Sequence, residues 1–175
     1  RGGEHLLSLI EGTLDIARIE AGKLTLDVKP MAFADCVHEL AAMFEPQAAA
    51  KGLRFHFALL SALPEVVRAD EKRVRQILIN LLGNAIKFTA QGEVALQVRY
   101  AREMAHIDIR DTGPGIQESV LREILKPFFT TKQQGTGLGL ATADRIVKAH
   151  GGVIGVESRP GDGAVFTVRL PETEA

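Results

Sequence analysis

The sequence predicts an α/β fold of the two-layer α+β kind: a mixed, largely antiparallel sheet, covered on one face by three main helices and preceded by one long helix. Three observations support this class. The chain has 175 residues, 46% of them hydrophobic, enough for one full core but not for a second compact domain. Segments with helical periodicity alternate with short extended segments. Several extended segments follow one another closely, as antiparallel neighbours do, so one sheet with helices on one face is expected.

The first predicted element is a helix over residues 4–21, ended by Gly22. Its apolar residues recur at steps of three and four, which gives one stripe to bury. A single amphipathic helix needs a partner for that stripe, so we expect a missing helix or a second chain to pack on it. Residues 24–28 then alternate like a short strand that Pro30 terminates. The stripe consists of Leu6, Leu7, Ile10, Leu14 and Ala17.

Two longer helices are predicted in the first half of the chain. Residues 34–51 carry apolar side chains on one side and stop at Gly52. A strand is expected at residues 54–60. Asp70 is then a suitable N-cap for a helix that runs to about residue 88, with a continuous apolar face.

The second half of the chain predicts most of the sheet. Alternating and β-branched segments indicate strands, and glycines and prolines separate them. The expected elements are strands at 94–100 and 105–110, a short helix near 117–126, a longer helix at 138–150, and a hairpin of strands at 153–158 and 164–170.

Composition excludes several classes of function. The 21 basic and 22 acidic residues nearly cancel, so neither nucleic acid nor an acidic membrane surface is an expected partner. The single cysteine, Cys36, cannot form an internal disulfide, which suits a reducing, cytoplasmic location. No apolar run approaches the roughly 18 residues of a membrane helix. We expect a cytoplasmic fragment without direct membrane contact, and a membrane anchor elsewhere in the parent protein stays open.

Asn80, Asn84 and Lys87 are spaced by four and three residues, so they lie within about 60° of one another on the predicted helix. Arg73 and Gln76 extend the same stripe. One interpretation is a solvated polar face. The other is a cation site, because asparagine inside a helix costs helix propensity. Its amide oxygen can ligate a hard cation such as Mg²⁺ without cancelling the cation's charge.

Residues 111–115 read Asp-Thr-Gly-Pro-Gly directly after a predicted strand. The simple interpretation is a tight turn. A carboxylate at a strand end, beside backbone without Cβ atoms, also suits the approach of a flat base with an exocyclic amine. The second interpretation indicates adenine, and these residues alone leave both open.

Residues 135–140 read Gly-Thr-Gly-Leu-Gly-Leu at the start of a predicted helix. Such glycines expose N–H groups, and a helix N-terminus attracts phosphate. Taken alone the pattern is weak, because it lacks both the long preceding strand of a dinucleotide site and the Lys-Ser/Thr of a Walker loop. Residues 127–134 combine two aromatic residues with a short polar segment. They indicate either an ordinary surface loop or a hinged lid whose Lys132 reaches a terminal phosphate.

Five segments resemble, in order, the N, G1, F, G2 and terminal Gly-rich boxes of the catalytic domain of two-component sensor histidine kinases. The resemblance covers about residues 24–170 and implies the Bergerat-type ATP-binding sandwich that this family shares with Hsp90, gyrase and MutL. The F and G2 boxes are closer to the kinase branch. The segments are residues 80–89, 111–116, 127–129, 135–140 and 161–166.

The resemblance implies roles for single polar residues. Asn84 is similar to the Mg²⁺ ligand, and Asn80 to the residue that orients the phosphates and the metal. Lys87 is similar to a phosphate contact, and Lys132 is the lysine that a hinged lid would bring to the terminal phosphate. Asn80, Lys87 and Lys132 are therefore the expected catalytic residues. Lys126 stands where the family often has Glu, which leaves the lid's phosphate contacts open.

The resemblance also implies a site for ATP or ADP. Phe88 would flank the nucleoside, and Asp111 would accept the adenine amino group. The expected nucleotide contacts, besides Asn80, Asn84 and Lys87, are Gly113, Gly115, Ile116, Thr131, Gly135, Thr136, Gly137, Leu138 and Gly139.

The opening helix resembles the second helix of the family's dimerisation hairpin. We therefore expect residues 1–23 to be the end of that hairpin and residues 24–175 to be the catalytic ATP-binding domain. The first helix, which would bring the phosphoacceptor histidine, has no counterpart. His5 lacks the acceptor's sequence context. His38 is followed by Glu39 but not by the expected proline, so an ordinary surface or core histidine is expected.

These resemblances imply a protein-histidine kinase fragment that binds Mg²⁺ and ATP. It would transfer the γ-phosphoryl group to a histidine outside this sequence, for relay to an aspartate of a response regulator receiver domain. The parent protein is expected to form a homodimer, and the fragment alone is not expected to phosphorylate itself. One alternative is a nucleotide-sensing module without kinase activity. The other, an ATP-driven clamp of the Hsp90 or MutL type, needs a hydrolytic glutamate early in the Asn helix, where Gln76 stands and Glu71 lies too far back.

Overall fold

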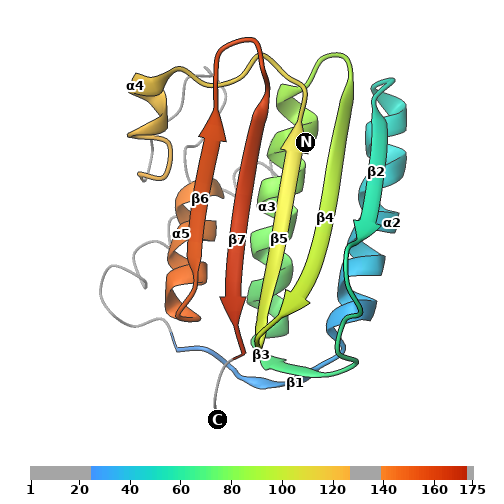
Figure 1. Cartoon of the computed structure of the whole chain (residues 1–175), viewed down its shortest axis with the longest axis vertical. Helices are drawn as coiled ribbons and strands as arrows, with labels where there is room; N and C mark the ends of the chain where they lie inside the picture. Colours follow the sequence, from blue (N-terminus) through green and yellow to red (C-terminus); the bar gives the residue numbers. More distant parts are fainter. Residues whose placement is uncertain (1–24, 127–138, 173–175) are drawn as a thin grey trace, which may run out of the picture.

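The structure, a computed structural model, describes residues 25–126 and 139–172. Its main sheet consists of β2 (Arg54–Leu59), β4 (Glu93–Ala101), β5 (Met104–Asp111), β6 (Val153–Ser158) and β7 (Ala164–Pro171). The strand order is β2-β4-β5-β7-β6 (Figure 1). β2 runs parallel to β4, whereas the other neighbouring pairs are antiparallel. The predicted mixed, largely antiparallel sheet is confirmed.

Three helices lie behind this sheet in Figure 1 and cover one of its faces. They are α2 (Phe33–Ala50), α3 (Glu71–Phe88) and α5 (Gly139–Ala149), as predicted to within a residue or so at each end. Each presents buried apolar residues to the core, and burying one large aliphatic side chain contributes about 1.5–3 kcal/mol. The stripe on α3 consists of Val74, Ile77, Leu78, Leu81, Leu82, Ala85 and Ile86.

Alternation along the strands separates the two faces of the sheet. In β4, Val94, Leu96 and Val98 are fully buried under the helices. The residue between the last two, Gln97, is half-buried and pairs in register with Asp108 of β5. The face away from the helices is therefore polar, as a period of two residues requires.

A side chain caps each end of α3. The Asp70 carboxylate accepts the backbone N–H of Arg73 at 3.2 Å, which confirms the predicted N-cap. At the other end, Lys51 Nζ donates to the carbonyl oxygens of Ile86 at 2.6 Å and Lys87 at 3.1 Å. A cation at these unpaired carbonyls stabilises the helix terminus. The last turn of α3 is thus held in place from α2.

Asp70 also ties α3 to its neighbours. Its backbone N–H donates to His150 Nε2 at 3.3 Å, while Nδ1 of the same buried ring faces the Ile146 carbonyl oxygen at 3.0 Å. Because a carbonyl only accepts, the ring proton sits on Nδ1. The Asp70 carboxylate accepts in addition the backbone N–H of Asp27 at 2.9 Å. One residue therefore connects the start of α3, the end of α5 and the segment that enters the domain.

The prediction of a short strand at residues 24–28 is wrong. The observed strand β1 lies at Lys29–Met31 and pairs antiparallel with β3 (Val67–Ala69), which the sequence did not predict. Pro30 stands inside β1 instead of ending it. Because β1 has a single partner strand, its other edge needs no N–H donors, and proline is tolerated there.

The predicted helix at residues 117–126 is shorter than expected. α4 spans only Glu118–Leu121, and the chain then continues in turns such as Glu123 N to Val120 O and Lys126 N to Glu123 O. α4 has no buried residues, so little packing energy supports a longer helix. The helix predicted at residues 4–21 lies outside the described residues.

Candidate functional site

A cavity of about 440 Å³ lies at the end of the sheet where β5 stops and β7 starts. This volume falls in the range of about 300–1,000 Å³ that small-molecule pockets occupy. The last turns of α3, the turn after β5, the α4 region, the start of α5 and the first residues of β7 enclose it. Its lining residues are Asn84, Ala85, Phe88, Asp111, Pro114, Gly115, Ile116, Gln117, Val120, Ile124, Leu140, Ala164 and Phe166.

Five of the residues singled out from the sequence line this cavity. Asn84 and Phe88 come from α3, while Asp111, Gly115 and Ile116 come from the end of β5 and the turn that follows. The helix and the turn are separate in the sequence, yet the fold brings them to one space. A tight turn and a polar helix face are thus parts of the same site.

Asp111 is the carboxylate of this cavity. Its Oδ1 accepts the backbone N–H of Gly113 at 2.9 Å, and the backbone N–H of Ala164 also hydrogen-bonds to the carboxyl group. Burial raises the pKa of Asp111 above its ordinary value of 3.8, and the two N–H donors act in the opposite direction. The site therefore holds a partly desolvated acceptor beside apolar walls.

Two glycines shape the turn after Asp111. A Cβ on Gly113 would lie 3.1 Å from Asp111 Oδ1 and 3.3 Å from the Phe88 carbonyl oxygen. Gly115 has φ +77°, and a Cβ there would overlap the carbonyl oxygen of Arg159 in the β6–β7 hairpin. The glycines let the turn lie directly against α3 on one side and against the hairpin on the other.

The polar stripe of α3 divides in the folded chain. Asn84 is half-buried and lines the cavity. Asn80, one turn earlier, donates from Nδ2 to the carbonyl oxygen of Gly139 at 3.0 Å and so contacts the start of α5. Lys87 is exposed, with Nζ 5.8 Å from the centroid of the Phe88 ring. Of these three, only Asn84 is among the described residues that line the cavity.

The donor set at Asn84 suits a hard cation that takes most of its ligands from elsewhere. In the described part of the chain, no group of three or more His, Cys, Asp or Glu residues could hold a metal ion. An amide oxygen at the cavity wall supplies one neutral ligand, and Mg²⁺ usually takes its remaining ligands from substrate phosphates and water. Asn84 therefore fits Mg²⁺ bound together with a phosphorylated ligand.

Several predicted site residues cannot be located. Thr131, Lys132, Gly135, Thr136, Gly137 and Leu138 lie outside the described residues. Gly139 is the first residue of α5, and its successor Leu140 lines the cavity. The site is thus described up to the helix that follows the glycine-rich segment.

Sequence analysis missed most of the apolar lining. Val120 and Ile124 come from α4 and the turn after it, and their four-residue spacing in an expected helix was the available signal. Ala164 and Phe166 belong to the terminal Gly-rich segment, which had been recognised as a motif but given no contact. These side chains supply the hydrophobic walls that a flat ring system requires.

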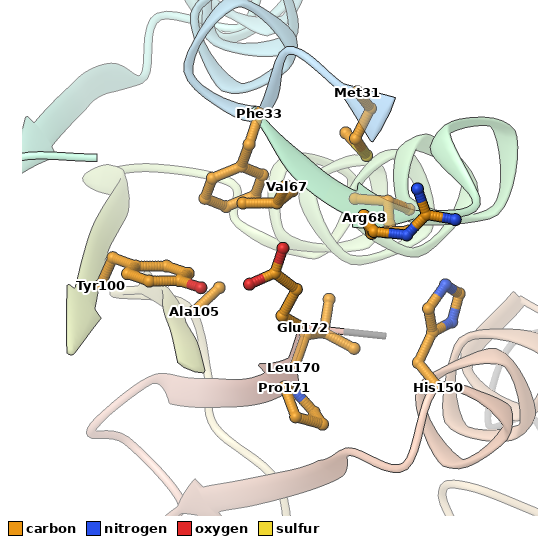
Figure 2. A pocket seen from close by; sticks show the side chains of 12 residues that line it. Met31, Phe33, Val67, Arg68, Tyr100, Ala105, His150, Leu170, Pro171 and Glu172 are labelled. Atoms are coloured by element: carbon orange, nitrogen blue, oxygen red, sulfur yellow. The ribbon is translucent and has the colours of Figure 1, made fainter. Parts of the chain in front are cut away.

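A second cavity, at the opposite end of the sheet, is too small for such a ligand. Its volume is about 20 Å³, enough for a single water molecule. Figure 2 shows Arg68, Tyr100, His150 and Glu172 around it, next to β1 and β3. None of the predicted site residues lines this cavity in the described structure.

The histidines of the described residues lie away from the large cavity. His38 is exposed on α2 and contacts the Phe57 ring edge-on, with 5.2 Å between the ring centroids. His56 pairs with Glu93 at 3.0 Å, and His150 is the buried tie described above. None of the described histidines lines the large cavity.

Comparison with known families decides the identity of this fold. Residues 69–174 match the family described as histidine kinase-, DNA gyrase B-, and HSP90-like ATPase. The chain belongs to this ATPase family. The matched region contains α3, the turn after β5, α5 and the closing hairpin, which are the elements that build the cavity. The chain therefore contains an ATP-binding domain of the family.

Similar proteins include sensor histidine kinases. The circadian input-output histidine kinase CikA of Synechococcus elongatus is 42% identical over 97% of this chain and 24% of its own length. The aerobic respiration control sensor protein ArcB of Escherichia coli is 37% identical over 93% of this chain and 22% of its own length. The chain thus spans about a quarter of these relatives, and its ATPase domain fits the catalytic part of a histidine kinase.

Solved structures agree with this assignment. Full-length ShkA in complex with AMPPNP superposes with a TM-score of 0.88 at 36% identity, over 99% of this chain and 37% of that one. The catalytic domain of histidine kinase ThkA superposes with a TM-score of 0.75 at 33% identity, over 85% of this chain and 97% of that one. The fold is that of histidine kinase catalytic domains. Among the described residues, no helix has the length and apolar character to cross a membrane.

Proposed function

We propose that this chain binds Mg²⁺ and ATP in the 440 Å³ cavity and donates the γ-phosphoryl group to a histidine outside this sequence. The observation that carries the proposal is the meeting of Asn84, Phe88 and Asp111 at one cavity in a member of this ATPase family. The AMPPNP complex of the similar protein ShkA supports a nucleotide in the same fold.

Adenine is the part of ATP that the apolar half of the cavity would hold. Ile116, Val120 and Phe166 offer flat apolar contact, and burial of such a ring is favourable by itself. Asp111 supplies the acceptor for the exocyclic amine, because its carboxyl oxygens accept hydrogen bonds and are partly removed from water. Desolvation makes an unpaired partner costly, so this contact discriminates between bases.

The phosphates would extend from the adenine pocket towards Asn84. This residue and Phe88 are one turn apart on the same side of α3, so a ligand that touches both runs along the helix. Lys87 follows Asn84 by three residues and is exposed, free to approach an anion at the mouth of the site. From the family resemblance, Lys132 and the N–H groups of Gly135, Gly137 and Gly139 would complete the phosphate contacts.

Magnesium bound with the nucleotide would neutralise charge on the phosphate oxygens. The chain's own contribution is to orient and to exclude water. Asn84 offers an oxygen at the wall, and Asn80 secures the start of α5 against α3. These contacts would hold the triphosphate for in-line attack, and the general base beside the acceptor histidine would come from outside this domain.

The remaining parts of the reaction are also proposals. The acceptor histidine would lie on a preceding helix of the dimerisation hairpin, of which residues 1–23 would be the second helix. The phosphoryl group would then pass to a response regulator receiver domain. The parent protein would be a homodimer, and the part described by this sequence would lie in the cytoplasm. Residues 24–175 would be the catalytic domain throughout.

The test separates binding from transfer. Titration calorimetry with the whole chain should show ATP binding that EDTA weakens. Incubation with γ-labelled ATP should leave the chain unlabelled, but a purified dimerisation hairpin added in trans should acquire phosphohistidine. Binding without any phosphohistidine would favour a nucleotide-sensing module, and absence of ATP binding would refute the proposal as a whole.

A further inference from the structure

We infer that Ser158 is a positioning residue of the base pocket, and that its hydroxyl sets the base preference of the site. This inference rests on the proposed function. Ser158 is the last residue of β6, is half-buried, and does not line the cavity itself. It acts through the residues that do.

The Ser158 hydroxyl bridges two walls of the cavity. Its Oγ accepts the backbone N–H of Ile116 at 2.8 Å and donates to the carbonyl oxygen of Gly163 at 2.5 Å. Ile116 lines the cavity from the turn after β5. Gly163 precedes Ala164, which lines the cavity from the start of β7. One hydroxyl therefore fixes the spacing between these walls.

The same bridge reaches Asp111. Ser158 pairs with Ala164 in the β6–β7 ladder, and the N–H of Ala164 hydrogen-bonds to the Asp111 carboxyl group. Gly163 lies so close to Asp111 that a Cβ on it would overlap the Asp111 carbonyl oxygen. A shift of the hairpin is thus transmitted directly to the carboxylate that would read the base.

Two further contacts connect the hairpin with the turn. The backbone N–H of Gly161 donates to the Pro114 carbonyl oxygen at 2.7 Å, and Gly115 packs without a Cβ against Arg159. These contacts are made by the backbone, so a substitution of Ser158 does not remove them. Among the described contacts, the Ser158 hydroxyl is the side chain that joins the hairpin to Ile116, so it is the one that mutation can remove.

A general loss of stability would not change base preference, whereas a shift of Ile116 and Asp111 would. ITP carries an oxo group where ATP carries the exocyclic amine, so position 6 of its base offers the Asp111 carboxylate an acceptor instead of a donor. The ratio of ATP to ITP affinity therefore reports the position of that carboxylate. A hydrogen bond of this kind changes such a ratio by about three- to tenfold.

The experiment measures ATP and ITP affinities of the whole chain by titration calorimetry for the parent, Ser158→Ala and Ser158→Thr. Ser158→Ala should lower the ATP/ITP ratio by about three- to tenfold, and Ser158→Thr, which keeps a hydroxyl, should restore most of it. Thermal unfolding without nucleotide shows that each variant is folded.

Ser61→Ala is the matched control. Ser61 Oγ also accepts a backbone N–H, from Tyr100 at 2.7 Å, and donates to a carbonyl oxygen, of Ala62 at 3.1 Å, but it lies away from the cavity. This variant should lose similar stability and keep the parent's ratio. An unchanged ratio in Ser158→Ala, or an equal loss in Ser61→Ala, would overturn the inference and leave the proposed function intact. A parent chain that binds ATP no better than ITP would overturn the inference as well, whereas a parent chain that binds neither nucleotide would overturn the proposed function itself.

Discussion

The side-chain amide of Asn80 donates to the backbone carbonyl of Gly139 across 3.0 Å, and this contact joins the middle of α3 to the first residue of α5. The two helices therefore keep a fixed distance at the point where the glycine-rich segment ends. Asn80 was expected to orient phosphates and metal. The contact with Gly139 would let it do so without touching the cavity, because it holds the helix that follows the segment proposed to bind phosphate.

Asn80→Ala should lower the free energy of unfolding by about 1 kcal/mol, the usual value of one intramolecular hydrogen bond. Asn80→Asp should cost more at neutral pH, because a carboxylate would face the Gly139 carbonyl oxygen. Urea denaturation without nucleotide measures both. Lys72→Ala, on an exposed position of the same helix, is the control. Equal stability of Asn80→Ala and the parent would show that the contact contributes nothing.

Asn84→Ala should weaken ATP binding at least about tenfold in the presence of Mg²⁺ and much less in EDTA, because the lost amide oxygen acts through the cation. Asn84→Asp should also weaken it, since a carboxylate cancels charge that the phosphates need. Calorimetric titrations with and without Mg²⁺ provide the comparison. The assignment of Asn84 fails if removal of Mg²⁺ weakens binding to parent and variants by the same factor.

Asp111 gives ATP binding a dependence on acid pH. Burial raises its pKa above 3.8, so the carboxylate is protonated at a higher pH than an exposed aspartate, and ATP affinity should fall as the pH drops through that pKa. A protonated carboxyl no longer accepts from the adenine amine in the same way. The effect of acid on folding stability has the opposite direction to its effect on ATP affinity. Because the pKa of Asp111 is raised in the folded state, that state binds the proton more tightly than the unfolded state, so protonation of Asp111 favours the folded chain.

Asp111→Asn removes this titrating group and should weaken ATP binding and discrimination against ITP. The variant also serves as the control for protonation of ATP itself, because ATP protonation changes the affinity of both proteins in the same way. Affinities measured over the acid pH range should therefore diverge between the two proteins at neutral pH and converge at low pH. Parallel pH profiles would exclude Asp111 as the group responsible.

Gly163→Ala and Gly161→Ala separate steric collision from backbone strain. Both glycines have positive φ, +75° and +86°, so alanine at either position costs about 1 kcal/mol from the left-handed conformation alone. Only at Gly163 would the new Cβ overlap the Asp111 backbone, whereas at Gly161 it meets open space. Gly163→Ala should lose more than about 2 kcal/mol in urea denaturation. A similar loss of unfolding free energy in both variants would mean that the hairpin can move away from the turn after β5 and so avoid the collision.

Much of the fold could be predicted because its elements are long and periodic. The stripe of α3 and its Asp70 cap appear in the sequence as a helix with a start, and the structure has both. β1 and β3 could not be predicted, since three-residue strands have no measurable period and are stabilised by pairing across distant residues. The predicted length of α4 was wrong for the opposite reason. Its residues suit a helix, but no packing supports more than one turn.

The candidate site divides in the same way. Asn84 and Asp111 were found because their residue types are unusual at their positions and belong to recognisable segments. Ser158 was missed, since a serine at a strand end has no chemical peculiarity, and its contact to Ile116 exists only when the β6–β7 hairpin meets the turn after β5. Val120 and Ile124 were read as helix residues without a target.

The sequence by itself determined the class of fold, the ATPase family and the residues whose chemistry suits a nucleotide, because periodicity, caps and glycine spacing are local properties. Only the tertiary structure decided which of these residues share a cavity. Asn84 faces it, whereas Asn80 one turn away reaches α5 instead. Burial of its apolar stripe against the sheet decides which face of a helix points towards the cavity. The free energy of that burial comes from contacts with residues distant in the chain.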